Sequence, residues 1–121
     1  MQLEKEEIVR ILFIEPDKKS HDILVGLLKD WFQDYVEIVW RSIYENGITE
    51  LKKGNFDLII SEVIFPERDD TEEVVLIDLS EVAGRHEVPI VIFSNSTDKS
   101  LPILSFQLGI CLLYTSDAAD E

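Results

Sequence analysis

The stretch Phe56-Asp57-Leu58-Ile59-Ile60-Ser61-Glu62-Val63 decides how the rest of the chain is interpreted. Its apolar residues fall on both faces of an extended backbone instead of alternating with polar ones. Strands of that composition are typical of the centre of a parallel sheet, where helices cover both faces. The stretch therefore predicts a buried central strand that ends near an acidic residue, Glu62.

Short β-rich segments and longer helical patterns alternate on either side of this strand. Further strands are predicted at 9–14, 36–40 and 89–94, and helices at 23–32, 43–53, 70–82 and 101–108. Repeats of strand and helix in this order imply right-handed crossovers. The sequence therefore predicts an α/β fold in which one parallel sheet lies between two layers of helices.

Several local signals refine these elements. Asp17 or Ser20 can cap the first helix, and Asp70 with Glu73 fits a capping box at the start of the third. The two tryptophans, at positions 31 and 40, are interpreted as core aromatics. The two histidines, at positions 21 and 86, have no second ligand at metal spacing and are expected at the surface.

Composition limits the function classes. The chain has 121 residues, which suits one domain, and a net charge of −14 from 25 acidic and 11 basic residues. That balance excludes nucleic-acid binding through this domain, because phosphate contacts need clustered Lys and Arg. The acids either solubilise the surface or in part converge on a divalent cation. No apolar run approaches the roughly 20 residues that a membrane span needs, and no signal peptide opens the chain, so we expect a cytoplasmic protein.

The last eleven residues need separate treatment. The string Cys111 to Glu121, CLLYTSDAADE, looks like a translated sequencing adapter. We therefore expect residues 1–110 to form the natural domain, truncated after its fourth helix, and residues 111–121 to be an adapter-derived tail that is left out of functional inference. The alternative is a genuine fifth strand at 112–114, because Leu-Leu-Tyr has β propensity.

Polar residues stand at three predicted strand ends. The first strand runs into Glu15-Pro16-Asp17, the third ends at Glu62, and the fourth ends at Ser94. In open parallel sheets the functional crevice lies outside the carboxyl ends of the strands. We therefore expect these side chains to share one site.

In order and spacing, residues 11–17, 57–66 and 88–94 resemble three strands of the receiver domains of two-component response regulators, the CheY-like superfamily. The resemblance covers residues 9–110. It implies a flavodoxin-like, doubly wound sheet with strand order 2-1-3-4-5. It also implies that Glu62 stands where such domains carry the phospho-accepting Asp, and that Ser94 is the switch hydroxyl that contacts the phosphoryl group.

The resemblance further implies a Mg²⁺ site, for which the ligands here would be Glu15, Asp17, Glu62 and Ile64. Mg²⁺ takes oxygen ligands beside the acceptor and neutralises phosphoryl charge during transfer. The partner implied is a histidine kinase or another signalling protein. A lysine on the fifth strand usually completes the pocket, and its position falls within the tail.

The sequence departs from the receiver pattern in ways that affect the acceptor. Glu62 places its carboxylate one C–C bond, roughly 1.5 Å, further out than Asp would. Pro16 replaces the second acid of the usual pair, Asp70 stands where Gly is common, and Asn95 stands where a small residue is usual.

Three interpretations of Glu62 follow from these departures. The residue imitates the charged state in a phosphorylation-independent receiver, or it still accepts phosphoryl groups poorly beside a bound metal. In the third, the pocket has become purely structural, with Glu62 solvated or paired with Arg68. We expect a receiver module that acts through protein–protein contact. The alternative from another class is a small metal-assisted phosphohydrolase that uses Glu15, Asp17 and Glu62.

Overall fold

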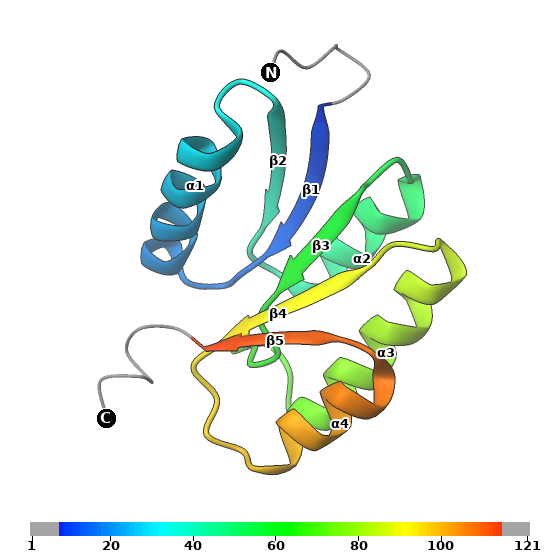
Figure 1. Cartoon of the computed structure of the whole chain (residues 1–121). Coiled ribbons are helices and arrows are strands. Elements are labelled where there is room, and N and C mark those ends of the chain that lie inside the picture. Colours follow the sequence, from blue (N-terminus) through cyan, green and yellow to red (C-terminus); the bar gives the residue numbers. More distant parts are fainter. Residues whose placement is uncertain (1–7, 115–121) are drawn as a thin grey trace.

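The computed structural model describes residues 8–114 and contains a five-stranded, all-parallel sheet (Figure 1). The strand order is β2-β1-β3-β4-β5, which confirms the predicted doubly wound α/β fold. The strands are β1 (Val9–Ile14), β2 (Val36–Arg41), β3 (Leu58–Ser61), β4 (Ile90–Ser94) and β5 (Cys111–Tyr114).

Four helices connect the strands and lie unequally on the two faces of the sheet. They are α1 (Lys18–Phe32), α2 (Tyr44–Lys53), α3 (Glu72–Arg85) and α4 (Ser100–Leu108). Figure 1 shows α1 on one side of the sheet and α2, α3 and α4 on the other. Within residues 8–114 no helix is long and apolar enough to cross a membrane.

Alternate residues of the central strands feed two separate cores. Leu12 and Ile14 of β1 pack on the side of α2 and α3, whereas Ile11 and Phe13 pack on the side of α1. All four side chains are fully buried. This is the pattern expected of a strand covered on both faces, and it fixes the register that carries Glu15 to the carboxyl end of the sheet.

The α2 helix lies unusually close to β1 at Gly47. A Cβ added to Gly47 would stand 2.6 Å from Cδ1 of Ile14, well inside van der Waals contact. Because Ile14 immediately precedes Glu15, this close packing helps to fix the end of β1. The structure therefore explains why a residue without a side chain suits this helical position.

The structure confirms the predicted start of α1 and contradicts the predicted start of α3. Asp17 caps α1, and its carboxylate accepts the backbone N–H of Ser20 at 3.1 Å, which confirms one of the two expected caps. The capping box at Asp70 and Glu73 was wrong. Thr71 caps α3 instead, because the carboxylate of Asp70 is held in an ion pair with Arg68 at 2.5 Å.

The structure confirms the predictions for Trp40 and His86, contradicts that for Trp31 and places His21 only partly at the surface. Trp40 packs in the α1-side core, where its indole N–H donates to the backbone oxygen of Glu15 at 2.9 Å. His21, which was expected at the surface, is half-buried, because its ring stacks on Trp40 at a centroid distance of 3.9 Å. His86 is exposed as expected. Trp31 was wrongly placed in the core, since 72% of it is exposed.

Residues 111–114 form the edge strand β5, paired parallel to β4. Leu-Leu-Tyr thus takes the strand conformation that its β propensity allows. The division into a domain at 1–110 and an adapter-derived tail at 111–121 stays a prediction, and residues 115–121 lie outside the described part.

Candidate functional site

The predicted polar site lies at the carboxyl ends of β1, β3 and β4. Glu15 directly follows β1, Glu62 directly follows β3, and Ser94 is the last residue of β4. The register places these strand ends side by side, since β3 pairs with both β1 and β4. The structure therefore brings together the three positions that the sequence placed at one crevice.

Glu62 is buried and turned inward, with 7% of its surface exposed. Its Oε2 accepts three hydrogen bonds: from the hydroxyl of Ser94 at 2.5 Å, from the N–H of Val63 at 2.7 Å and from the N–H of Ile64 at 3.3 Å. The interpretation of Glu62 as a solvated acid or a partner of Arg68 was wrong. Arg68 pairs instead with Asp70 and Glu45.

Burial and hydrogen bonding oppose each other at this carboxyl. Burial raises the pKa of Glu62, and the nearby charge of Glu72 adds to that increase. The bonds from Ser94 and the two backbone N–H groups lower the pKa, but not enough to cancel the cost of burial. In this arrangement Oε2 accepts all three hydrogen bonds.

Ser94 connects Glu62 to the loop that precedes α4. The side chain is completely buried, and its Oγ both donates to Glu62 and accepts the N–H of Ser96 at 3.1 Å. The hydroxyl of Ser96 in turn donates to Glu72 of α3 at 2.6 Å and accepts the N–H of Asp98 at 3.2 Å. A continuous set of hydrogen bonds therefore runs from the end of β3 to both α3 and the β4–α4 loop.

Sequence reasoning missed Ser96 and Glu72. Both are common residue types in a loop and in the first turn of a helix, and neither belongs to a spaced motif. A serine two residues beyond a strand-end serine was the only available signal. Their pairing depends on the packing of α3 against the β4–α4 loop, which spacing alone does not reveal.

Glu15 is the second buried acid of the site, with 2% of its surface exposed. Its carboxylate accepts one hydrogen bond, from the N–H of Asp17 at 3.1 Å. Burial raises the pKa of Glu15 to about 7, the nearby charges of Glu62 and Asp17 add to the increase, and the bond from Asp17 opposes it. Glu15 therefore titrates near neutral pH, unlike an ordinary surface glutamate.

The carboxylate of Asp17 is engaged elsewhere. It accepts both the hydroxyl of Ser20, at 2.8 Å, and the backbone N–H of the same residue. These bonds lower the pKa of Asp17. Asp17 thus stays ionised, but its charge is directed at the start of α1.

A cavity of about 260 Å³ contains the predicted ligands. It is lined by Glu15, Pro16, Asp17, Ser20, Glu62, Ile64, Pro66 and Asn95. All four predicted metal ligands thus face one space. Pro16 and Asn95, two further departures from the receiver pattern besides Glu62, also lie in its wall.

The donor set in this cavity does not fit a divalent cation as it stands. Among residues 8–114, no three Asp, Glu, His or Cys side chains converge as ligands. Glu15 titrates near neutral pH, Asp17 caps α1, and Oε2 of Glu62 already accepts three hydrogen bonds. The predicted set of Glu15, Asp17, Glu62 and Ile64 therefore stays a prediction, and we derive no step through a metal.

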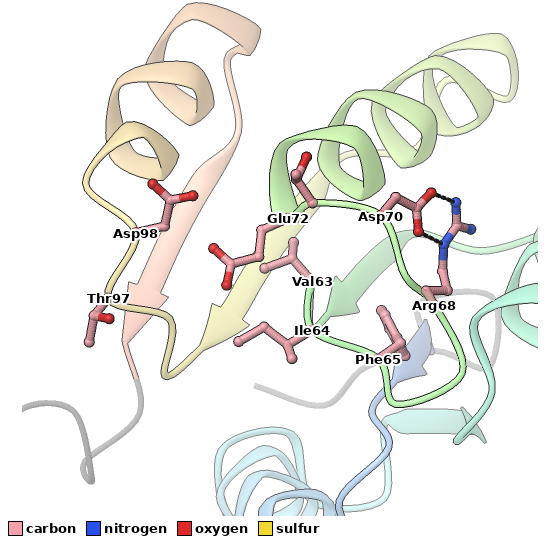
Figure 2. Close-up of a pocket in the computed structure, with 9 residues that line it drawn as sticks. Val63, Ile64, Phe65, Arg68, Asp70, Glu72, Thr97 and Asp98 are labelled. Atoms are coloured by element: carbon pink, nitrogen blue, oxygen red, sulfur yellow. Dashed lines mark hydrogen bonds and ion pairs between the residues drawn. The ribbon is translucent and has the colours of Figure 1, made fainter.

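A second cavity, of about 410 Å³, lies between the β3–α3 and β4–α4 loops. Figure 2 shows Arg68 and Asp70 paired at one end, with Glu72 and Asp98 at the other. Arg68 also lies over the ring of Tyr44, at 4.6 Å from its centroid. The single cation in this wall is thus bound to neighbours and leaves an acidic space beside Ser96.

Of the comparisons with known proteins, the one with solved structures supports the fold. Neither protein-family models nor curated protein sequences give a match. Among solved structures, the Mn²⁺-bound form of response regulator Rcp1 has a TM-score of 0.74 at 20% identity, over 91% of this chain and 86% of that one. The phosphorylated cyanobacterial phytochrome response regulator RcpA has a TM-score of 0.73 at 18% identity, over 93% and 84%.

A two-component response regulator from Clostridium difficile is also similar, with a TM-score of 0.68 at 20% identity, over 88% of this chain and 81% of that one. Identities of this size speak for the fold. The five-stranded topology and these matches agree with the resemblance drawn from the three sequence segments. The chain therefore has the fold of a response-regulator receiver domain.

Proposed function

We propose that the chain is a receiver module of two-component signalling that acts through protein–protein contact and does not depend on phosphorylation. The observation that carries this proposal is the buried hydrogen bond from Ser94 to Glu62, at 2.5 Å. In the receiver scheme the strand-end hydroxyl contacts the phosphoryl group. Here a carboxylate of the chain itself holds that hydroxyl.

The length of the glutamate side chain supports the idea that the Glu62 carboxylate takes the place of the phosphoryl group as the partner of Ser94. Glu62 extends roughly 1.5 Å further than an aspartate at the same position would. That extension carries its carboxylate across to β4, where Ser94 donates to it. A permanent partner for Ser94 would hold the β4–α4 loop in one arrangement and remove the need for a phosphoryl group.

The geometry also supports the proposal that Glu62 accepts phosphoryl groups poorly. Phosphoryl transfer depends on positioning the acceptor oxygen in line with the donor, usually beside a cation that neutralises charge. Oε2 of Glu62 accepts three hydrogen bonds, and its carboxyl has a raised pKa. Among residues 8–114, no three Asp, Glu, His or Cys side chains converge as metal ligands, and this disfavours the metal-assisted phosphohydrolase.

An exposed apolar surface on α4 offers a place for partner contact. Ile103 is 64% exposed and Phe106 is 87% exposed. The hydrogen bonds through Ser96 connect the site to the loop that leads into α4. We propose that a histidine kinase or another cytoplasmic signalling protein binds this surface.

The test is incubation with Mg²⁺ and acetyl phosphate, followed by intact mass measurement. We expect the chain to gain no phosphoryl group, and a stoichiometric adduct on the unmodified chain would contradict the proposal. The variant Glu62→Asp shortens the side chain and frees Ser94. It therefore shows whether the glutamate itself or the surrounding pocket prevents phosphorylation. Labelling of this variant alone would identify the glutamate as the block, whereas no labelling of either would show that the surrounding pocket also lacks the needed ligands.

A further inference from the structure

The cavity between the β3–α3 and β4–α4 loops combines apolar and acidic walls. Its volume of about 410 Å³ exceeds the roughly 260 Å³ of the cavity at the strand ends. One wall is made by Val63, Ile64 and Phe65, of which Ile64 is 41% exposed. Another carries the carboxylates of Glu72 and Asp98 (Figure 2). The cavity therefore offers apolar surface to one part of a ligand and negative charge to another.

The carboxylates of Glu72 and Asp98 are each held by one oxygen. Oε2 of Glu72 accepts the hydroxyl of Ser96 at 2.6 Å. Oδ1 of Asp98 accepts the backbone N–H and the hydroxyl of Ser100, at 3.0 and 2.8 Å. No N–H group or hydroxyl of residues 8–114 donates to the second oxygen of either carboxylate. These second oxygens are available to a donor from outside the chain.

The arginine in the wall of this cavity does not neutralise the two acids. Arg68 donates to both oxygens of Asp70, at 2.8 and 2.5 Å, and to Glu45 at 3.3 Å. Figure 2 shows the pair of Arg68 and Asp70 at the opposite end of the cavity from Glu72 and Asp98. None of the ion pairs within residues 8–114 includes either of these two acids. The acidic end of the cavity is therefore complementary to a cation that the described chain does not supply.

The chemistry of the walls favours an organic cation over a metal ion. Ca²⁺ and Mg²⁺ take about six or more oxygen ligands, and within residues 8–114 no three Asp, Glu, His or Cys side chains converge as ligands. A guanidinium group is planar, weakly hydrated and able to donate to two acceptors at once. Its methylene stem packs on apolar surface, which the exposed Ile64 provides in the same cavity.

We propose that this cavity binds an arginine side chain of a partner protein, with the guanidinium between Glu72 and Asp98 and the methylene stem against Ile64. The inference rests on the proposed function, because it takes the bound arginine to belong to a protein. The net charge of −14 favours a partner with a basic contact surface.

The place of the cavity connects it to the surface and the site already described. Asp98 stands two residues before α4, so a partner that inserts an arginine here also reaches the start of the helix with the exposed apolar surface. Ser96 donates its hydroxyl to Glu72 and its N–H to Ser94. A bound arginine would therefore contact the hydrogen bonds that lead to Glu62.

Amide spectra of the full chain, titrated with N-acetyl-L-arginine N-methylamide, test the proposal. We expect saturable shifts at Ile64, Glu72 and Asp98, with a Kd of about 1–10 mM, because partly exposed ion pairs contribute little each. The corresponding blocked citrulline has nearly the same shape without the charge and should cause no saturable shift.

Matched variants show whether the two acids are responsible. Glu72→Gln combined with Asp98→Asn keeps acceptors for Ser96 and Ser100 and should weaken binding at least about tenfold. Asp30→Asn combined with Glu81→Gln removes two exposed charges outside the cavity and should leave the Kd unchanged. Equal affinity in the two double variants, or shifts that spread over the acidic surface without saturation, would overturn the proposal.

Two further titrations distinguish other ligands. Saturable binding of Ca²⁺ at the same amides would assign the cavity to a metal ion and overturn the proposal. Free L-arginine that binds more than about tenfold tighter than the blocked form would do the same, because it would assign the cavity to a free amino acid. The acetyl phosphate test measures Glu62 and leaves this cavity untouched, so the two proposals fail separately.

Discussion

Glu62 and Glu15 are both buried glutamates at neighbouring strand ends, and their surroundings differ. Glu62 is held by a hydroxyl and two backbone N–H groups, whereas Glu15 accepts a single N–H. Burial raises the pKa of both carboxyls. The comparison shows that two buried acids with raised pKa values can still differ in how many donors hold their carboxyl groups in place.

The largest expected effect is on stability when Glu62 is removed. Glu62→Ala leaves three donors without an acceptor in a buried site, and we expect it to lower the free energy of unfolding by about 3 kcal/mol. Glu15→Ala removes one bond and should cost about 1 kcal/mol. Urea unfolding of both variants checks the difference. Equal losses would contradict the distinction between the two acids.

The next effect is a dependence of stability on pH that comes mainly from Glu15. Its pKa is raised from 4.5 to about 7, so the folded state binds its proton more tightly than the unfolded state does. The stabilisation is therefore complete below pH 4.5 and is lost as pH rises through about 7. Between pH 5 and 8 we expect a loss of about 2 kcal/mol.

Glu15→Gln is the control for that pH dependence, because it keeps the shape of the side chain and does not titrate. We expect most of the loss between pH 5 and 8 to disappear in this variant. The raised pKa of Glu62 acts in the same direction and accounts for the remainder. A profile that stays unchanged in Glu15→Gln would assign the titration to another group.

A smaller effect is expected when the hydroxyl that joins the two strands is removed. Ser94→Ala takes away a donor to Glu62 and an acceptor for the N–H of Ser96, and should cost about 1–2 kcal/mol. It should also raise the pKa of Glu62 further, because a bond that lowers it is lost. Carboxyl chemical shifts measured against pH check this. The exposed Ser42→Ala serves as control.

The smallest expected effect is that of a divalent cation. Because the acids of the 260 Å³ cavity do not converge as ligands, we expect Mg²⁺ at millimolar concentration to leave the unfolding temperature unchanged. Mn²⁺ broadening of amide signals near Glu15 and Glu62 provides a more sensitive check. Saturable broadening at these two residues would support the ligand set drawn from the sequence.

The sequence predicted the architecture and the place of the site well. Hydrophobic periodicity predicts the alternation of strands and helices. In a parallel sheet of this topology the carboxyl ends of β1, β3 and β4 lie at the same edge. Glu15, Glu62 and Ser94 could therefore be placed at one crevice without coordinates. The strand order came from the resemblance to receiver domains.

What the sequence could not predict is which partner each polar side chain takes. Asp70 had the right spacing for a capping box, and yet its carboxylate pairs with Arg68. Trp31 follows the apolar period of α1, and yet it lies on an uncovered flank. Such outcomes depend on rotamers and on neighbours distant in sequence, which spacing does not encode.

The central claim is that the Glu62–Ser94 hydrogen bond sets the arrangement of the β4–α4 loop. The most direct test compares amide spectra of the unmodified chain, Glu62→Gln and Ser94→Ala, with Ser42→Ala as control. We predict that both site variants shift the amides of residues 94–101 and of α4, while the control does not. Shifts confined to the immediate neighbours of positions 62 and 94 would contradict the claim.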